Sequence, residues 1–313
     1  MKRFLLLLCL VAAVDTLPAQ DLDPATAWAT IASYQFRVFP NPELHPLESP
    51  GLVYYRAGNI DLKVGVITPG PETVVRPTVL YIHGGGWVHY TKDNMIFALL
   101  PYLARGMDVV NVDYRQANQV RAPAAVEDCR CALHWVFKHA KEYGFDTERL
   151  VVAGGSAGGH LALMTGMLDE KAGFDDACAF SVGEQPVKVA AIVNFFGISD
   201  VAEVLSPPNR QSWAVEWFAG VPDRMELARR LSPLTYVRPN LPPIITVHGT
   251  ADKGVPYEQS VRLHQALDKA GVPNELVTIP NGGHGSYPDG EKLRAQARVF
   301  DFLEKHRVLK ASH

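Results

Sequence analysis

A serine lies at the centre of a glycine-rich turn between an apolar strand-like run and an apolar helical run. Residues 150–153 read Leu-Val-Val-Ala, residues 154–160 read Gly-Gly-Ser-Ala-Gly-Gly-His, and residues 161–167 are mostly apolar. A sharp strand-to-helix turn lifts the hydroxyl of Ser156 out of the sheet, and only small residues at positions 154 and 158 fit beside such a turn. The helix that follows directs its positive N-terminal end at developing negative charge. The pattern therefore predicts a nucleophilic serine on an α/β scaffold.

A phosphate-binding glycine loop is the alternative for this segment. Such loops end in Gly-Lys-Ser/Thr or follow the spacing Gly-x-Gly-x-x-Gly, and residues 154–160 do neither. We therefore prefer the nucleophile interpretation.

The rest of the chain alternates between short apolar runs and longer amphipathic stretches. Strands are expected at residues 52–55, 62–68, 78–82, 109–112, 150–153, 189–195, 244–247 and 275–279. Helices with apolar residues at steps of three and four are expected at 123–143 and 257–270, each followed by a glycine, Gly144 or Gly271. This alternation predicts an α/β fold with a mostly parallel sheet, helices on both faces, and two leading edge strands.

The domain organisation follows from where this alternation begins and where it is interrupted. We expect a signal peptide at 1–19, an irregular segment at 20–50, and a catalytic domain at 51–308. Residues 199–240, here called the insertion, form a long, proline-interrupted and aromatic connection between two strands. Connections of this length in compact domains are usually functional or disordered, and the aromatic content argues for an ordered lid.

The N-terminus has the order of parts of a secretory signal peptide. Lys2 and Arg3 precede an apolar run at 4–14, and small residues allow cleavage after Ala19. The run is short for a membrane span, so a retained anchor is the weaker alternative, and lipid attachment at Cys9 is weaker still. The expected location is periplasmic or secreted.

Charge and cysteine content exclude several classes of partner. Thirty basic and 33 acidic residues give a net charge of −3 without a run of like charges, so nucleic acid is not an expected partner. Cys129 and Cys131 lie two apart on a predicted helix and point in different directions, so we expect small buried side chains. Neither a disulfide framework nor a metal site is predicted, and no cofactor is implied.

A second glycine run follows the predicted strand at 78–82. Residues 83–87 read His-Gly-Gly-Gly-Trp. Ester hydrolysis passes through a tetrahedral oxyanion, and two backbone N–H groups have to point at it in advance. Gly84 and Gly85, with the N–H of Ala157, are the candidates for this oxyanion hole.

A base and an acid for Ser156 are expected downstream, in the order acid then histidine. Asp252 follows the predicted strand at 244–247, and His284 lies in a glycine-rich loop after the strand at 275–279. The carboxyl ends of parallel strands form the edge at which open α/β sheets place their sites. His83, His160 and His248 neighbour these motifs, and we expect each of them to fix its loop.

Together these motifs resemble the hormone-sensitive-lipase-like esterases and related bacterial feruloyl and acetyl-xylan esterases. The resemblance rests on residues 83–87, 113–115, 154–160, 248–252 and 283–285, and it extends from about residue 53 to 303. It implies the α/β-hydrolase fold, a triad of Ser156, Asp252 and His284, and action on plant cell-wall decorations. The sequence departs from the lipase-like pattern after Arg115, where Gln-Ala-Asn replaces Leu-Ala-Pro, and it lacks a helical N-terminal cap.

The leading hypothesis is a serine esterase that cleaves carboxylic esters of short-chain or aromatic acyl groups through an acyl-enzyme, with a small-molecule or carbohydrate-linked substrate. An amide hydrolase of the formamidase or peptidase type is the alternative among enzymes. A non-catalytic binding module is less favoured, because all three triad residues are present.

Aromatic residues are the candidates for contacting the substrate. Trp87 adjoins the glycine run, and Trp213, Trp217 and Phe218 lie in the insertion. They either wall the acyl pocket or form the ordinary core of the insertion, and the sequence leaves both alternatives open.

Overall fold

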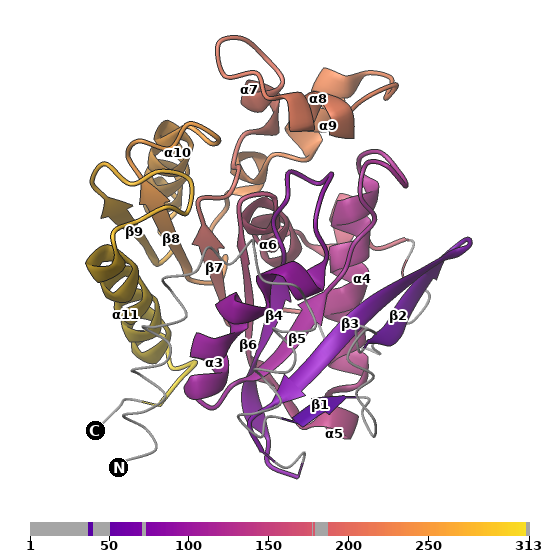
Figure 1. The fold of residues 1–313 in the computed structure, drawn as a ribbon, viewed down its shortest axis with the longest axis vertical. Coiled ribbons are helices and arrows are strands. Elements are labelled where there is room, and N and C mark those ends of the chain that lie inside the picture. Colours follow the sequence, from indigo (N-terminus) through magenta and orange to yellow (C-terminus); the bar gives the residue numbers. More distant parts are fainter. Residues whose placement is uncertain (1–36, 40–50, 71–72, 177, 179–186, 311–313) are drawn as a thin grey trace.

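A computed structural model describes residues 37–39, 51–70, 73–176, 178 and 187–310, and in it helices cover both faces of one sheet (Figure 1). The nine strands have the order β1-β3-β5-β4-β6-β7-β8-β9, and β2 pairs with β3 outside this path. The strands are β1 (Arg37–Phe39), β2 (Leu52–Ala57), β3 (Ile60–Thr68), β4 (Arg76–Ile82), β5 (Asp108–Val112), β6 (Phe145–Gly155), β7 (Ala191–Phe195), β8 (Ile244–Gly249) and β9 (Asn274–Ile279). Six strands are parallel to one another: β4, β5, β6, β7, β8 and β9. The strands β1, β2 and β3 pair antiparallel.

The strands agree with the sequence-based prediction in number and position, with one addition. The eight expected runs all become strands whose ends differ by a few residues. The addition is β1, three residues within the segment 20–50, which is too short to show an alternating pattern. The rest of that segment and the predicted signal peptide at 1–19 lie outside the described residues.

Two separate apolar clusters explain why helices cover both faces of the sheet. On one face, alternate strand residues pack against α4 (Ala124–Lys138), α6 (Ala157–Met167) and α10 (Tyr257–Lys269). On the other face, the intervening strand residues pack against η1 (Lys92–Leu99), α3 (Leu100–Ala104) and α11 (Asp289–Lys305). The parallel strands are therefore buried on both sides, as their continuous apolar sequences require.

The predicted helix at 123–143 is interrupted at His139, where α4 ends and the short α5 (Ala140–Tyr143) begins. Gly144 then adopts the left-handed conformation with φ 76°, which terminates the helix as expected. No helix within the described residues is long and apolar enough to cross a membrane.

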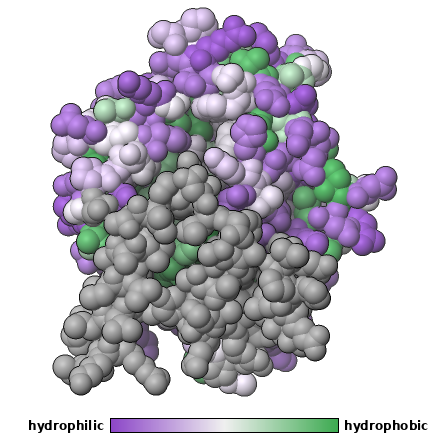
Figure 2. Space-filling model, in the orientation of Figure 1, coloured by the Kyte–Doolittle hydropathy of each residue, from purple (hydrophilic) through white to green (hydrophobic). Residues whose placement is uncertain are grey.

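The insertion folds into short helices above the carboxyl ends of the strands (Figure 1). It contains α7 (Val201–Val204), α8 (Ser212–Trp217), α9 (Arg224–Arg230) and η3 (Pro233–Tyr236). On the face shown in Figure 2, hydrophilic side chains predominate over this part of the molecule. Its own core is apolar and includes Ala214, Trp217 and Phe218, each at most 1% exposed.

The expectation that the cysteines form no disulfide is wrong. Cys131 on α4 forms a disulfide with Cys178, across a Cα–Cα distance of 5.0 Å, whereas Cys129 is free and buried. Cys129 and Cys131 do not pair with each other, as predicted. The partner was missed because Cys178 is 47 residues away and reaches α4 only through the path of the chain after α6.

Candidate active site

Ser156 occupies a strained turn between β6 and α6. Its backbone has φ 58° and ψ −123°, a conformation that non-glycine residues rarely adopt. Its N–H donates to the carbonyl of Phe195 at 2.9 Å, which ties the turn to β7. Gly158 packs so closely against the carbonyls of Ile82 and His83 that a Cβ there would collide with both. The Gly-x-Ser-x-Gly pattern is thus required by the approach of the chain segments.

The structure brings the three predicted triad residues into one hydrogen-bonded chain. Nε2 of His284 lies 2.8 Å from Oγ of Ser156, and Nδ1 of His284 lies 2.7 Å from Oδ2 of Asp252. The side chain of Asp252 is fully buried, whereas that of His284 is 35% exposed. Asp252 follows β8 and His284 follows β9, so the parallel register of these strands places the two loops side by side.

The carboxylate of Asp252 is held in its ionised form. Its Oδ1 accepts hydrogen bonds from the N–H groups of Gly254 and Val255 at 2.7 and 2.9 Å. Burial alone would raise the pKa of Asp252, but hydrogen bonds from His248 and His284 outweigh it and keep this pKa well below its ordinary value. A permanently charged Asp252 holds the imidazole of His284 with Nδ1 protonated and Nε2 free to accept the proton of Ser156.

The glycine run at 84–86 lies against this turn. A Cβ on Gly84 would come within 2.8 Å of the carbonyl of Gly155 and 3.5 Å of Cβ of Ser156. Gly85 has φ 108°, where an L side chain is strained and would strike the carbonyl of His89. Ala157 is the first residue of α6, a position whose N–H has no partner within the helix.

Two buried side chains, His83 and Tyr114, fix the orientation of the Gly84–Gly85 peptide. The carbonyl of Gly84 lies 2.7 Å from Nδ1 of His83 and 3.1 Å from the hydroxyl of Tyr114, which donates to it. The two rings stack at 4.2 Å. Burial lowers the pKa of His83 to about 4, so the ring is neutral and Nδ1 carries its hydrogen. Because C=O and the next N–H of a planar trans peptide point in opposite directions, the N–H of Gly85 points away from His83 and Tyr114.

The aromatic residues proposed to contact a substrate divide into two groups. Trp87, Trp217 and Phe218 are at most 1% exposed. Trp87 stacks on Trp217 with ring centroids 4.1 Å apart, so these three form the core between the insertion and the glycine run. Trp213 is half-buried and lies against Gly86. Of the four, Trp213 is the one whose position suits contact with a bound molecule.

Phe196, which the sequence analysis did not single out, lies beside the catalytic loop. Its ring is 4.7 Å from the ring of His284 in an edge arrangement, and it lies close to Gly155. A Cβ on Gly285 would come within 2.9 Å of the Phe196 ring. Its place directly after β7 was the available signal, because neighbouring strands end at the same edge.

His160 links the insertion to the turn that carries Ser156. Its Nε2 lies 2.7 Å from the carbonyl of Leu231 in the insertion, and the indole N–H of Trp87 donates to its Nδ1 at 3.2 Å. Burial lowers the pKa of His160 to about 4, so it stays neutral in this network. His83 and His160 therefore fix loops, in line with the expectation from the sequence.

One cluster of potential metal ligands lies outside this site. Ligand atoms of His134, Asp175 and Cys178 all lie within 4.8 Å of one another. However, the sulfur of Cys178 is bonded to Cys131, and Arg130 pairs with both carboxylate oxygens of Asp175. The cluster is therefore occupied by a disulfide and an ion pair.

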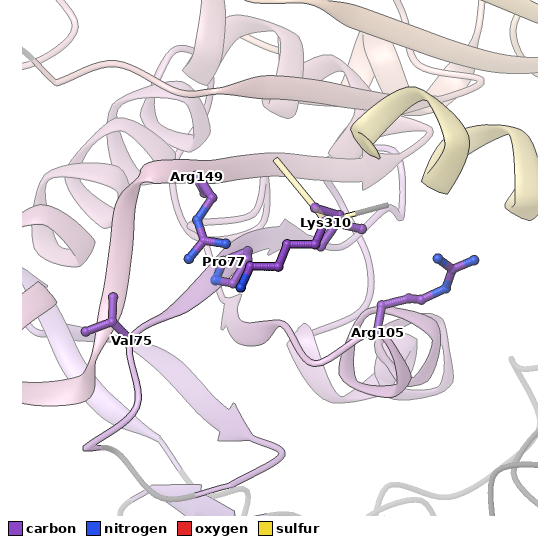
Figure 3. Close-up of a pocket in the computed structure, with 6 residues that line it drawn as sticks. Val75, Pro77, Arg105, Arg149 and Lys310 are labelled. Carbon is purple, nitrogen blue, oxygen red and sulfur yellow. The ribbon is translucent and has the colours of Figure 1, made fainter. Parts of the chain in front are cut away.

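A pocket of about 280 Å³ is lined in part by residues at the start of β4 (Figure 3). It is lined by Val75, Pro77, Arg105, Arg149, Leu309 and Lys310. Arg105 pairs with Glu304 and Arg149 with Asp146, so part of its positive charge is neutralised. It contributes nothing to the triad, because it lies near the start of β4 and the triad lies beyond the other end of the sheet.

Comparison with known proteins identifies the family. The BD-FAE family model matches residues 65–267, which is more than half of the chain. The chain belongs to the BD-FAE family. Esterase LipC of Mycobacterium tuberculosis is 31% identical over 220 residues, covering 67% of this chain and 53% of LipC. Carboxylesterase NlhH of the same organism is 30% identical over 233 residues, covering 73% of this chain and 72% of NlhH.

Solved structures give the same result for the fold of this BD-FAE chain. Esterase Est2 of the planctomycete Thermogutta terrifontis, in a butyrate-bound structure, has a TM-score of 0.71 and 28% identity, covering 85% of this chain and 96% of Est2. The fold is the α/β-hydrolase fold, and the resemblance to esterases is confirmed at the level of the family. The match spans only about half of the first curated relatives, at 53% of LipC and 50% of LipQ.

Tyr114→Phe tests whether the hydrogen bond from Tyr114 to the Gly84 carbonyl fixes the orientation of the Gly84–Gly85 peptide. Without the hydroxyl, His83 is the remaining side-chain donor to the Gly84 carbonyl, and the N–H of Gly85 is held less firmly. We therefore expect the rate of p-nitrophenyl acetate hydrolysis to fall about tenfold. Tyr54→Phe is the matched control, because the buried hydroxyl of Tyr54 donates at 2.8 Å to the carbonyl of Asp113, outside this loop. Equal losses in the two variants would contradict the assignment.

Proposed function

We propose that this chain is a serine hydrolase that cleaves carboxylic esters through an acyl-enzyme. The observation that carries the proposal is the continuous hydrogen-bonded chain from Oγ of Ser156 through His284 to the buried Asp252. His284 takes the proton as Oγ of Ser156 attacks the ester carbonyl, and then returns it to the leaving alcohol. A water molecule activated by His284 next attacks the acyl-enzyme and releases the acid.

The oxyanion formed in both steps is stabilised by backbone N–H groups at Gly84, Gly85 and Ala157. Gly84 lies against Ser156, and Ala157 directly follows it at the N-terminus of α6. Fixed donors in a site of this kind contribute roughly 10²- to 10³-fold each to the rate. Because the loop is held by His83 and Tyr114, these donors need no rearrangement during the reaction.

Structures of the Thermogutta terrifontis relative support a nucleophile of this kind. One structure, with a TM-score of 0.67 and 25% identity over 87% of this chain and all of that chain, is of the esterase phosphorylated by paraoxon. Organophosphates of this type phosphorylate activated serines: the serine oxygen bonds to phosphorus and p-nitrophenolate leaves. The same reagent is therefore a direct probe for Ser156.

Ser156→Ala should abolish labelling by paraoxon and lower ester turnover by at least ~10³-fold, with the fold intact by circular dichroism. Mass spectrometry of the labelled wild type should place the adduct on the peptide that contains Ser156. Ser212→Ala, an exposed serine on α8, is the control and should behave as wild type. An adduct elsewhere, or a tenth of the activity remaining in Ser156→Ala, would contradict the assignment.

We further propose that the acyl group is short or aromatic. Trp87, Trp217 and Phe218 fill the core beneath the insertion, so their apolar surface is not available to line a site for a long acyl chain. The outer surface of the insertion carries exposed charges at Arg210, Glu216, Asp223, Arg224, Arg229 and Arg230. Trp213, which lies against Gly86, and Phe196, which lies against Gly155 and His284, remain as flat aromatic surfaces suited to a short acyl chain or a planar ring.

Two supports point to the class of substrate. Two structures of the Thermogutta terrifontis esterase hold bound butyrate and bound propionate, both short acids. The motif resemblance to feruloyl and acetyl-xylan esterases suggests plant polysaccharide decorations as the natural esters. In that case the alcohol released by hydrolysis is a hydroxyl group of a sugar.

Specificity constants for p-nitrophenyl esters should fall as the acyl chain lengthens beyond about eight carbons, because the apolar surface that a longer chain needs is already buried in the core. Acetyl, butyryl and hydroxycinnamoyl esters should be cleaved best, and the matched anilides of the same acids measure amide hydrolysis. Values of kcat/KM that rise steadily from octanoyl to hexadecanoyl would exclude this proposal.

The last part of the proposal is export from the cytoplasm. The basic and apolar N-terminal sequence supports it, and so does the disulfide between Cys131 and Cys178, since disulfides persist mainly in oxidising compartments. The function is then that of a periplasmic or secreted esterase.

Mass spectrometry of the native protein tests export. We expect an N-terminus near Gln20 and, without reduction, a crosslinked peptide pair containing Cys131 and Cys178, because removal of the signal and oxidation both follow translocation. Blocking free thiols before digestion controls for later oxidation. Residues 1–19 still attached and both thiols free would contradict this part of the proposal.

A further inference from the structure

A second histidine bonds to the acid of the triad from inside the protein. His248 is the fifth residue of β8 and is fully buried. Its Nε2 lies 3.2 Å from Oδ2 of Asp252, the same oxygen that His284 contacts, and 3.1 Å from the carbonyl of Val255. Its Nδ1 lies 2.7 Å from Oγ of Ser260 on α10. His248 therefore has a partner on each nitrogen and no access to a substrate.

The partners determine where the hydrogen of His248 resides. The carbonyl of Val255 can only accept, and so can the ionised carboxylate of Asp252, so Nε2 carries the hydrogen and shares it between them. The hydroxyl of Ser260 can donate to Nδ1. A neutral ring thus satisfies every contact, and Ser260 holds the ring in the orientation that aims Nε2–H at Asp252.

With His248 included, the carboxylate of Asp252 has four donors. Gly254 and Val255 donate to Oδ1, and His248 and His284 donate to Oδ2. A carboxylate has about four acceptor positions, so all of them are filled in a side chain that is fully buried. The carboxylate cannot rotate without breaking several bonds at once.

We propose that His248 is a positioning residue for the hydrolysis, which holds Oδ2 of Asp252 in place so that His284 stays aligned with Ser156. The inference rests on the proposed function, because alignment matters only if His284 acts as a base. Loss of the donor would leave Oδ2 with an unfilled acceptor position in a buried site, and the carboxylate would turn or become more basic.

The proposal has a signature in the pH dependence. A more basic carboxylate at Asp252 stabilises the protonated form of His284. Since the base has to be neutral to accept the proton of Ser156, the acid limb of the rate profile moves to higher pH. Tyr257, whose ring centroid lies 5.6 Å from that of His248 in an edge arrangement, Tyr287 and the exposed Lys253 are titratable groups near this site. Burial and the charge of Asp252 raise the pKa of Tyr287, so it stays neutral across this limb.

Two conservative variants separate the donor at Nε2 from the rest of the ring. The amide nitrogen of His248→Gln reaches the position of Nε2 and can still donate to Asp252. The amide of His248→Asn reaches only the position of Nδ1, so it keeps a contact with Ser260 and loses Asp252. Both variants stay polar, which favours folding of each.

We expect His248→Asn to lower kcat/KM roughly 10- to 100-fold, almost entirely through kcat, and to move the acid limb upward by about half a pH unit. His248→Gln should remain within about threefold of wild type, with its limb in place. His264→Asn is the control for loss of a buried ring, because His264 on α10 is 5% exposed and bonds through Nδ1 to Asn274, away from the triad. The acid limb of the rate profile of His264→Asn should not move.

Three results would overturn the proposal: His248→Asn with an unmoved limb, His248→Gln as impaired as His248→Asn, or an equal shift in His264→Asn. Each can occur in an active enzyme whose Ser156 is labelled by paraoxon, in which case the proposed function stands and only the role of His248 falls. A wild type that neither hydrolyses esters nor takes up paraoxon would remove both.

Discussion

The backbone turn at Ser156 is the constraint on which the remaining active-site geometry depends. A positive φ of 58° at a non-glycine residue is unfavourable by itself, so the surrounding structure has to hold it. The hydrogen bond to Phe195, the tight packing of Gly158 under Ile82 and His83, and the burial of α6 on all sides hold this turn. The same contacts bring the glycine run after β4 against the hydroxyl of Ser156, so the strain and the oxyanion donors have one structural cause.

Around the triad the fixed charge is the carboxylate of Asp252, and two buried histidines are neutral. His83 and His160 are buried, and burial lowers the pKa of each to about 4, so they act as neutral hydrogen-bonding groups. Each bonds to a backbone carbonyl, His83 to that of Gly84 beside the hydroxyl of Tyr114, and His160 to that of Leu231. Asp252 is the negative charge closest to His284, and its carboxylate meets four donors. In the mechanism proposed above, the fixed negative charge of Asp252 favours protonation of His284 as Ser156 attacks.

The sequence was sufficient to predict those site residues that follow parallel strands and so lie at one edge of the sheet. Asp252 and His284 could be predicted because each follows a strand whose carboxyl end lies at the same edge as the Ser156 turn, and Gly84 because its neighbours lack a Cβ. Contacts made by the path of the chain could not be predicted in this way. Cys131 meets Cys178, Phe196 meets His284, and Trp217 turns inward onto Trp87, and each depends on how two elements are placed in space. Periodicity and motif spacing carry no information about such placement.

The aromatic contacts also decide what kind of structure the insertion is. Trp217 and Phe218 are buried against Trp87 of the glycine run, and His160 bonds to Leu231. Lifting the insertion would expose these side chains at roughly 1.5 to 3 kcal/mol each and leave Nε2 of His160 without the carbonyl of Leu231. Those costs approach the whole stability of an ordinary domain. The insertion is therefore a fixed wall of the site, continuous with the core.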